Sequence, residues 1–282
     1  MRQRLSALKI VFLSLLLISS CSIENQNSNR TIEDIADEIL DATMLRYPST
    51  PTFYSIKNSP HDQLYDNSLN ALKQWQIRED QWLEELDTIG EPKKVGSRDW
   101  VTFGIIYESL AASRDARVCR KELWETSTTT AWYTGLPFIF DIQPLDSVNL
   151  KSQALNRLGQ VSHFIDREIQ NLTIGLSQGY SSPGITVEAV PSEVRMLLEP
   201  NSPFLLMGER AEDEEFNNQV KGIFDDEIAP AIRRYAQFIE NKYLGQARAN
   251  LSINSNPDGS KCYPALVRSF STIPPTAAAI HD

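Results

Sequence analysis

Residues 147–178 read SVNLKSQALNRLGQVSHFIDREIQNLTIGLSQ, and this stretch decides the fold class. Its apolar residues recur every three or four positions, the spacing of one face of an α-helix: Leu150, Ala154, Leu158, Val161, Ile165, Ile169, Leu172 and Leu176. Asp146 can cap the start of this helix. Gly179 can end it, because glycine readily adopts the left-handed backbone found after helices. We therefore predict one long amphipathic helix over residues 147–178.

The segments before this helix are also expected to be helical, apart from one long loop. Thr31 is a good N-cap for a helix that ends before Pro48. The apolar spacing predicts further helices over residues 62–88 and from a cap at Ser97 to about residue 124. Residues 125–146 show no clear period, and we expect them to form a long ordered loop.

The segments that follow continue the helical pattern. We predict helices over residues 183–198, over 211–246 with a break or bend at Pro230, and over about 260–270. No run alternates apolar and polar residues with the period of two that strands require. The prediction is an all-α fold, an irregular helical domain with long amphipathic helices, over residues 31–282.

The first residues resemble the signal of a bacterial lipoprotein. A basic start precedes an apolar run at residues 10–18, which is shorter than the roughly 20 residues that span a bilayer. The run ends in Ile18-Ser19-Ser20-Cys21, which is similar to a lipobox. The resemblance implies a signal peptide over residues 1–20, a lipid on Cys21 and a tether over residues 21–30. The alternative is a plain signal peptide, or an uncleaved anchor, with a chance cysteine.

The charge of the chain bears on its partners. The formal net charge is −10, and removing residues 1–20 takes away three basic residues and makes it −13. No Lys/Arg cluster is present to form a basic face, which argues against nucleic-acid binding. An acidic body is repelled by anionic headgroups, so we expect the lipid to hold the protein at the membrane. By resemblance to enteric lipoproteins, Ser22 after the cysteine favours the outer membrane, facing the periplasm.

The sequence shows no complete catalytic constellation. His61, His163 and His281 each lack a second histidine within four residues, so the helical zinc-hydrolase spacing does not occur. His163, Asp166 and Glu168 are expected to form a surface cluster. There is no Gly-x-Ser-x-Gly elbow and no glycine-rich phosphate loop after a strand. We therefore assign no catalytic residue, metal ligand or cofactor to this chain.

Two further features leave alternatives open. Cys119 and Cys262 remain after maturation, and an envelope location permits either a disulfide or two buried thiols. Aromatic residues also crowd the region of the predicted loop, where they can line a ligand groove or act as core and loop anchors: Trp124, Trp132, Tyr133, Phe138 and Phe140.

Three stretches, in this order, are similar to motifs of one bacterial family. CRKELW at residues 119–124 resembles its CRxELW segment. NLTIGLSQGYSSP at residues 171–183 resembles its NLxxGLxxGYxxP motif. PDGSKCYPALVR at residues 257–268 resembles its PxGxxCYxAxxR segment. The family is domain of unknown function 885.

The resemblance implies the N-terminal part of a larger zincin-like α-helical fold. Members of the family carry a His-Glu-x-x-Pro-Gly-His zinc motif in a C-terminal half and look like metallopeptidases, so zinc is expected only with that half. By resemblance Tyr263 and Arg268 face a substrate groove, although we favour packing or a surface ion pair. The family reads similarly to Tyr-Thr-Thr where this chain has residues 269–272, SFST, and this departure weakens the groove assignment.

These observations lead to three hypotheses about function. The first is an envelope lipoprotein that resembles the N-terminal half of a zinc metallopeptidase and is inactive alone. The second is a binding or scaffold lipoprotein without catalysis. The third is one half of a split peptidase, completed by a C-terminal half on another chain. The sequence leaves open whether the protein is an enzyme.

Overall fold

The computed structural model describes residues 30–271, and within this range the chain is all-α, as predicted. A compact unit begins at Thr31. The one extended pairing found among the described residues is an isolated bridge between Pro183 and Arg248. The predicted signal peptide, Cys21 and His281 lie outside the described residues.

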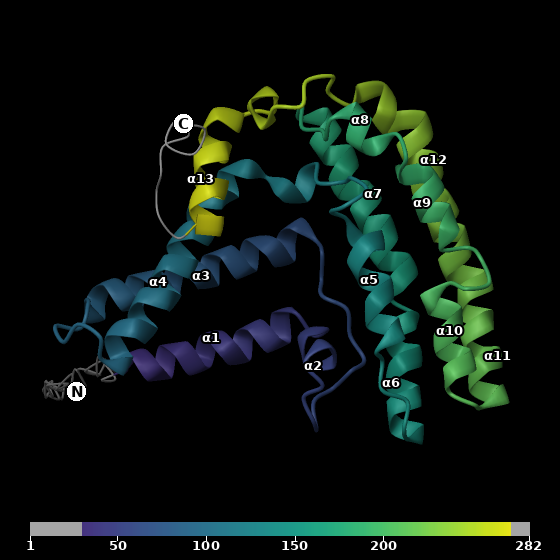
Figure 1. Ribbon diagram of the computed structural model, residues 1–282, viewed down its shortest axis with the longest axis horizontal. Coiled ribbons are helices and arrows are strands. Elements are labelled where there is room, and N and C mark those ends of the chain that lie inside the picture. The colour runs from purple at the N-terminus through teal and green to yellow at the C-terminus, as the bar shows by residue number, and fades with distance from the viewer. Residues whose placement is uncertain (1–29, 272–282) are drawn as a thin grey trace, which may run out of the picture. The chain divides into compact units, whose positions relative to one another are not determined.

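A first group of helices lies together in the fold (Figure 1) and shares one hydrophobic core. It comprises α1 (Ile32–Arg46), α3 (Leu69–Ile89) and α4 (Arg98–Ala116), which pack against one another. The last helix, α13 (Gly259–Ser271), returns from the far end of the sequence to pack against α4. The buried apolar residues of this core are Ile32, Ile35, Trp82, Leu83, Leu86, Phe103, Leu110 and Ala111.

A second group of helices surrounds a larger core. In it α12 packs against α7 and α9, and α10 packs against α5 and α11 (Figure 1). The helices are α5 (Trp132–Asp141), α6 (Val148–Leu158), α7 (Val161–Ser177), α8 (Gly184–Val187), α9 (Val190–Met196), α10 (Pro203–Arg210), α11 (Glu214–Ile223) and α12 (Ala229–Phe238). Shorter turns are α2 (Thr50–Phe53), η1 (Arg117–Cys119), η2 (Lys121–Leu123), η5 (Leu244–Gln246) and η6 (Ile253–Ser255).

Local signals at several helix ends act as predicted. The Thr31 hydroxyl accepts a hydrogen bond from the backbone N–H of Asp34 at 3.1 Å, and the Asp34 carboxylate accepts one from the Thr31 N–H at 2.8 Å. This reciprocal capping box satisfies two donors at the start of α1. Ser97 caps α4 through the Trp100 N–H at 3.2 Å. Gly179 follows α7 with a φ of 82°, the left-handed conformation expected there.

The prediction of one helix over residues 147–178 is wrong, because the chain forms α6 and α7 with a break at Gly159 and Gln160. The Gln160 side chain accepts a hydrogen bond from the Leu64 N–H at 2.9 Å and donates one to the Asp62 carbonyl at 2.8 Å. The break therefore coincides with a contact to a segment that is distant in sequence. The spacing of apolar residues contains no information about such a contact. The cap is Ser147, not Asp146, since the Ser147 hydroxyl accepts from the Leu150 N–H at 3.2 Å.

The helix predicted over residues 62–88 begins only at Leu69, after a cap by Ser68. Residues 62–67 are not helical. They are held instead by Arg157 of α6, which donates to the Gln63 carbonyl at 3.0 Å, by Gln160 in the break, and by Glu168 of α7, which accepts from Asn67 at 2.6 Å. The helix expected to reach residue 124 likewise ends at Ala116 and continues only as the turn η1, after which Arg120 takes a left-handed backbone with a φ of 46°.

The long loop predicted over residues 125–146 is also wrong, since it contains α5. This helix is buried on most of its surface, including Trp132, Tyr133, Leu136 and Phe140. A helix with little polar surface shows little polar periodicity. Pro137 lies inside α5, where one hydrogen bond is lost, and this also argued against a helix in the sequence.

The segments predicted to be helical after residue 183 are helical, but the boundaries of the helices differ from the predicted ones. The helix expected over residues 183–198 is divided into α8 and α9, and α10 was not predicted. The segment around Pro230 remains helical, with the π-helical segments η3 (Phe224–Ile228) and η4 (Ile239–Tyr243) on either side of α12. Pro230 is the second residue of α12, directly after η3, so its missing N–H falls where the π-helical segment changes to an α-helix. The helix predicted near residues 260–270 is α13.

Candidate functional site

A cleft lies between parts of the chain that are distant in sequence. The C-terminal end of α1, the segment before α3, the turn η2, and helices α5 and α7 line it. Its volume is about 680 Å³, within the range of small-molecule sites. The side chains that determine its chemistry are Arg46, Tyr47, Tyr65, Trp132, Phe164 and Glu168. We call it the Glu168 cleft.

Aromatic rings form much of the wall of the Glu168 cleft. The rings of Tyr65 and Phe164 meet edge to face, with centroids 5.1 Å apart. Tyr47 lies next to Tyr65 at 6.0 Å. Burial raises the pKa of the Tyr65 phenol above its ordinary value, so this wall is uncharged at neutral pH. Such rings offer π faces to a bound ligand.

Glu168 places a carboxyl group in this aromatic setting. It comes from α7 and is partly buried. Its Oε1 accepts a hydrogen bond from Asn67 Nδ2 at 2.6 Å. Burial raises the pKa of Glu168 to about 6, because desolvation disfavours the charged form more than the Asn67 bond stabilises it. Because this pKa lies close to neutral pH, small changes around the carboxyl group alter how far it is protonated.

Asn67 is itself fixed by α7. Besides Glu168, its Nδ2 donates to the Phe164 carbonyl at 3.0 Å, and its own carbonyl accepts from Asn171 Nδ2 at 2.9 Å. Asn171 is buried. These bonds hold the turn before α3 against α7, so the Glu168 carboxyl is supported by a rigid partner.

The other charged groups of the cleft that lie on or near η2 have partners. Lys121 pairs with Glu125 at 2.9 Å, and Glu122 pairs with Arg120 at 2.7 Å. Glu168 differs from them, because no cation of the described range 30–271 lies within ion-pair distance of it.

Sequence reasoning missed Glu168 by placing it in a surface cluster. The assignment holds for two members of that cluster, since His163 is exposed beside Arg167 and Asp166 pairs with Arg234 at 2.8 Å. It is wrong for Glu168. The available signal was its spacing, four residues after Phe164 and four before Leu172, both of which are buried apolar residues of the same helix face.

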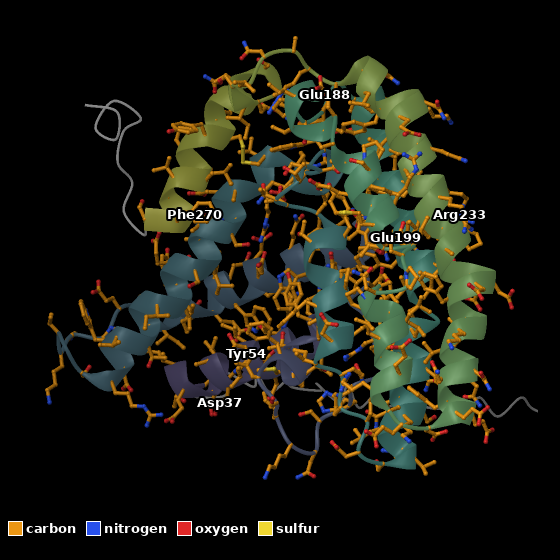
Figure 2. All side chains as sticks on the ribbon, turned by 45° about the vertical axis from the view of Figure 1, so that its right-hand side comes forward. Asp37, Tyr54, Glu188, Glu199, Arg233 and Phe270 are labelled. Carbon is orange, nitrogen blue, oxygen red and sulfur yellow. A yellow bond between two sulfur atoms is a disulfide. The ribbon has the colours of Figure 1, made fainter. Side chains whose placement is uncertain are left out.

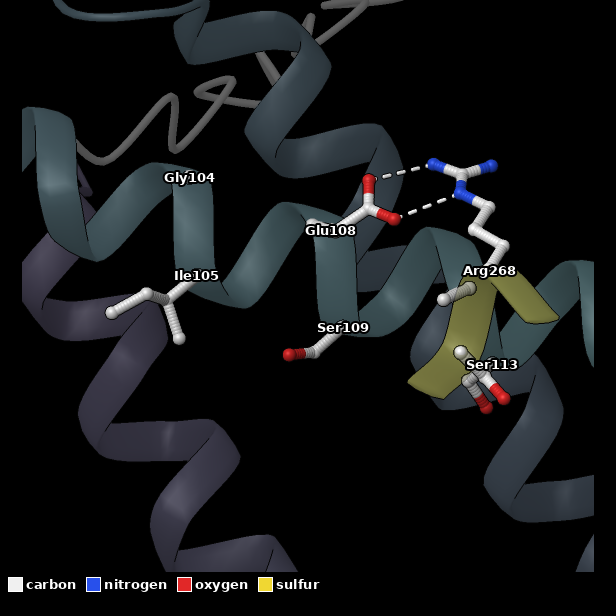
Figure 3. A pocket seen from close by; sticks show the side chains of 8 residues that line it. Gly104, Ile105, Glu108, Ser109, Ser113 and Arg268 are labelled. Carbon is white, nitrogen blue, oxygen red and sulfur yellow. Dashed lines mark hydrogen bonds and ion pairs between the residues drawn. The ribbon is translucent and has the colours of Figure 1, made fainter. Parts of the chain in front are cut away.

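Arg268 lies away from this cleft, in a groove of about 700 Å³ between α4 and α13 (Figure 3). Its guanidinium donates to both carboxylate oxygens of Glu108, at 2.8 and 2.7 Å, and also pairs with Asp115. Those hydrogen bonds raise the pKa of Arg268 above its ordinary value and lower that of Glu108. The ion pair that we favoured for Arg268 is present. Tyr263, on the same helix, is partly buried and lines neither cavity.

Cys119 and Cys262 form a disulfide that joins η1 to α13 (Figure 2). Both residues are buried, and 143 positions separate them in the sequence.

The three motif stretches meet at the junction that this disulfide marks. Ser182 Oγ, in the second stretch, donates to the Trp124 carbonyl of the first at 2.7 Å. The Ser181 N–H donates to Asn256 Oδ1, next to the third stretch, at 3.1 Å. Gly175 lets α7 approach the backbone of Leu123 so closely that a Cβ would overlap its carbonyl oxygen. These motif residues therefore join segments of the fold that are far apart in sequence.

The described histidines and acidic residues do not converge on a metal. Within residues 30–271, no group of three or more His, Cys, Asp or Glu side chains is placed to hold an ion. His61 is buried, and its Nδ1 lies 2.8 Å from the Thr52 hydroxyl. Burial and the nearby Arg157 lower the pKa of His61, which keeps its ring neutral.

The five aromatic residues for which the sequence left a groove or an anchoring role open divide between the two. Trp132 is buried and borders the cleft, whereas Tyr133 and Phe140 belong to the core. Trp124 anchors its turn by donating from Nε1 to the Cys119 carbonyl at 2.7 Å. Phe138 is 47% exposed on the outer face of α5.

Comparison with known proteins supports the fold and the family. No curated protein matches the chain. Among solved structures, "the putative lipoprotein from Colwellia psychrerythraea" superposes with a TM-score of 0.73 at 14% identity, over 89% of this chain and 48% of that one. The chain thus spans about half the length of that structure. Residues 48–282 match the model of a family described as bacterial protein of unknown function. The chain belongs to this family, DUF885.

Proposed function

We propose that this protein is a bacterial envelope lipoprotein whose helical unit forms a ligand-binding wall of a metallopeptidase-like protein and does not catalyse hydrolysis alone. The observation that carries the binding role is the Glu168 cleft, which combines aromatic walls with a partly buried carboxyl group. A concave site with a few polar groups among apolar ones is the usual form of a ligand site.

The envelope location is supported by two independent features. The sequence around Cys21 resembles a lipobox, and the similar solved structure is described as a "putative lipoprotein". None of the helices in the described part of the chain is long and apolar enough to cross a membrane. We propose attachment through a lipid on Cys21, with the helical unit facing the periplasm from the outer membrane.

The proposed lack of autonomous catalysis can be tested directly. In this proposal the zinc ligands and the catalytic glutamate belong to a complementary C-terminal half, as the family resemblance implies. The purified mature protein is expected to contain no stoichiometric zinc and to cleave no peptides. Elemental analysis and a fluorogenic peptide mixture would measure both properties. One zinc per chain, removed by a chelator together with hydrolysis, would contradict the proposal.

A second candidate is one half of a split peptidase, with the other half on a separate chain. An exposed aromatic patch on α2 and α5 favours it: Phe53, Tyr54 and Phe138 are 54, 68 and 47% exposed, and the rings of Phe53 and Phe138 lie 6.1 Å apart (Figure 2 labels Tyr54). Exposed apolar patches commonly mark protein interfaces. Mixing the chain with a separately expressed complementary half should then restore zinc-dependent hydrolysis, and a scaffold role would leave the mixture inactive.

A further inference from the structure

The Glu168 cleft has a carboxylate without a countercharge. Asn67 donates to one oxygen of Glu168, and no group of the described residues 30–271 is bonded to the other oxygen. Two cations, Arg46 and Lys121, line the cleft against three carboxylates, and Lys121 is already paired with one of these, Glu125. Glu122 is paired with Arg120, so Glu168 is the carboxylate of the cleft for which the described residues supply no ion-pair partner.

The aromatic walls suit a cationic group. Electron-rich ring faces attract ammonium and guanidinium groups within about 6 Å of the ring centre. The protein already uses this attraction, since the guanidinium of Arg46 lies 5.5 Å from the centre of the Tyr47 ring and 5.8 Å from that of Tyr65. Arg46 is kept in this position because it donates to the Asp66 carbonyl at 2.6 Å. Tyr65 and Phe164 line the same cleft as Glu168, so a ligand cation bound there would lie among rings of this kind.

We infer that the Glu168 cleft recognises a positively charged side chain of its ligand, a guanidinium or ammonium group, by an ion pair with Glu168 between aromatic walls. This inference rests on the proposed binding role and adds the chemical class of the ligand. The raised pKa of Glu168 supports it, because a bound cation would stabilise the ionised form and recover part of the desolvation cost. Binding should therefore weaken as the pH falls through about 6.

The test compares arginine amide with citrulline amide, which has nearly the same shape but no charge on its side chain. Isothermal titration of the full lipidated protein in detergent micelles is expected to give at least about tenfold tighter binding of arginine amide. Glu168→Gln should remove this preference, because glutamine keeps the shape and can still accept the Asn67 bond. Asp166→Asn is the matched control, since it removes a carboxylate from the same helix outside the cleft, and it should retain the preference.

A second variant separates failure of charge recognition from failure of the binding role. Gly135 lines the cleft from α5, and a Cβ placed there would meet nothing within 4 Å, so a side chain can start there, and Gly135→Trp is chosen to fill the cleft. It should abolish binding of both amides. If the wild type binds both equally and Gly135→Trp abolishes both, the cleft binds ligands without reading charge, and only the cation inference is overturned. The inference is equally overturned if arginine amide does not bind at 10 mM or more, or if its preference survives Glu168→Gln.

Discussion

Gly175 is one of the residues at which two distant motif stretches touch. A Cβ at this position would overlap the Leu123 carbonyl, so Gly175→Ala must separate α7 from η2. Such overpacking typically costs about 1–3 kcal/mol. The expected result is a lower free energy of unfolding, measured by urea titration followed by circular dichroism.

Gly222→Ala provides a matched control for this substitution. Gly222 is an exposed residue of α11, and a Cβ there would meet nothing within 4 Å. Alanine is a better helix former than glycine, so this variant should gain about 0.5–1 kcal/mol. An equal effect of both substitutions would show that helix propensity, and not the contact with Leu123, determines the role of Gly175.

Glu168 should make stability depend on pH in a defined direction. Its pKa in the folded protein is about 6, against an ordinary value of 4.5. The folded state therefore favours the protonated carboxyl, and its contribution to stability is complete below about pH 4.5 and is lost as the pH rises through 6. The loss amounts to about 2 kcal/mol at most.

Glu168→Gln is expected to remove this dependence, because glutamine stays neutral. The variant should be more stable than the wild type at pH 8, and the difference should shrink towards pH 4.5. Urea unfolding at the two pH values measures it, with Asp166→Asn as the control for loss of a charge from α7. A difference of the same size at both pH values would mean that Glu168 does not titrate as described.

At the scale of elements, sequence patterns succeeded where the signal was local. The cap at Ser97, the glycine after α7 and the existence of α13 all depend on residues close in sequence. The failures came from contacts over long distances. The helix breaks at Gln160, whose side chain bonds Asp62 and Leu64, although the apolar repeat continues. The exposed face of α5 carries the apolar Phe138 as well as polar residues, so its period is weak in the sequence. The Glu168 cleft was missed for the same reason, since five segments that are far apart in sequence form it.

The disulfide should determine how firmly α13 is held. It closes a loop of 143 residues, and the chain entropy removed from the unfolded state corresponds to roughly 5 kcal/mol. Reduction is therefore expected to lower the thermal midpoint of the wild type by several degrees. Replacing both Cys119 and Cys262 by Ser should give the lower midpoint and make it insensitive to reductant. A wild-type midpoint that does not change on reduction would contradict this role.

At the scale of the whole molecule, the two hydrophobic cores contain most large apolar residues of the range 30–271, and the exposed aromatic patch on α2 and α5 stands apart from them. Phe53 contacts both Tyr54 and Phe138 through its ring, so the patch is one continuous surface. Water-exposed aromatic surface of this kind is costly unless it is covered. In a purified sample, contact between copies of the chain is the simplest way to cover the aromatic patch.

We therefore predict that the polypeptide of residues 22–282 self-associates in solution. Light scattering after gel filtration should show a mass that rises with concentration, and Phe53→Glu should reduce it, because like charges would then face each other across the contact. Val148→Glu is the control, since Val148 is 87% exposed on α6 and lies outside the patch. The control should leave association unchanged. A monomeric wild type with a cooperative melt would show instead that the patch is tolerated in water and that the helical unit is a finished domain.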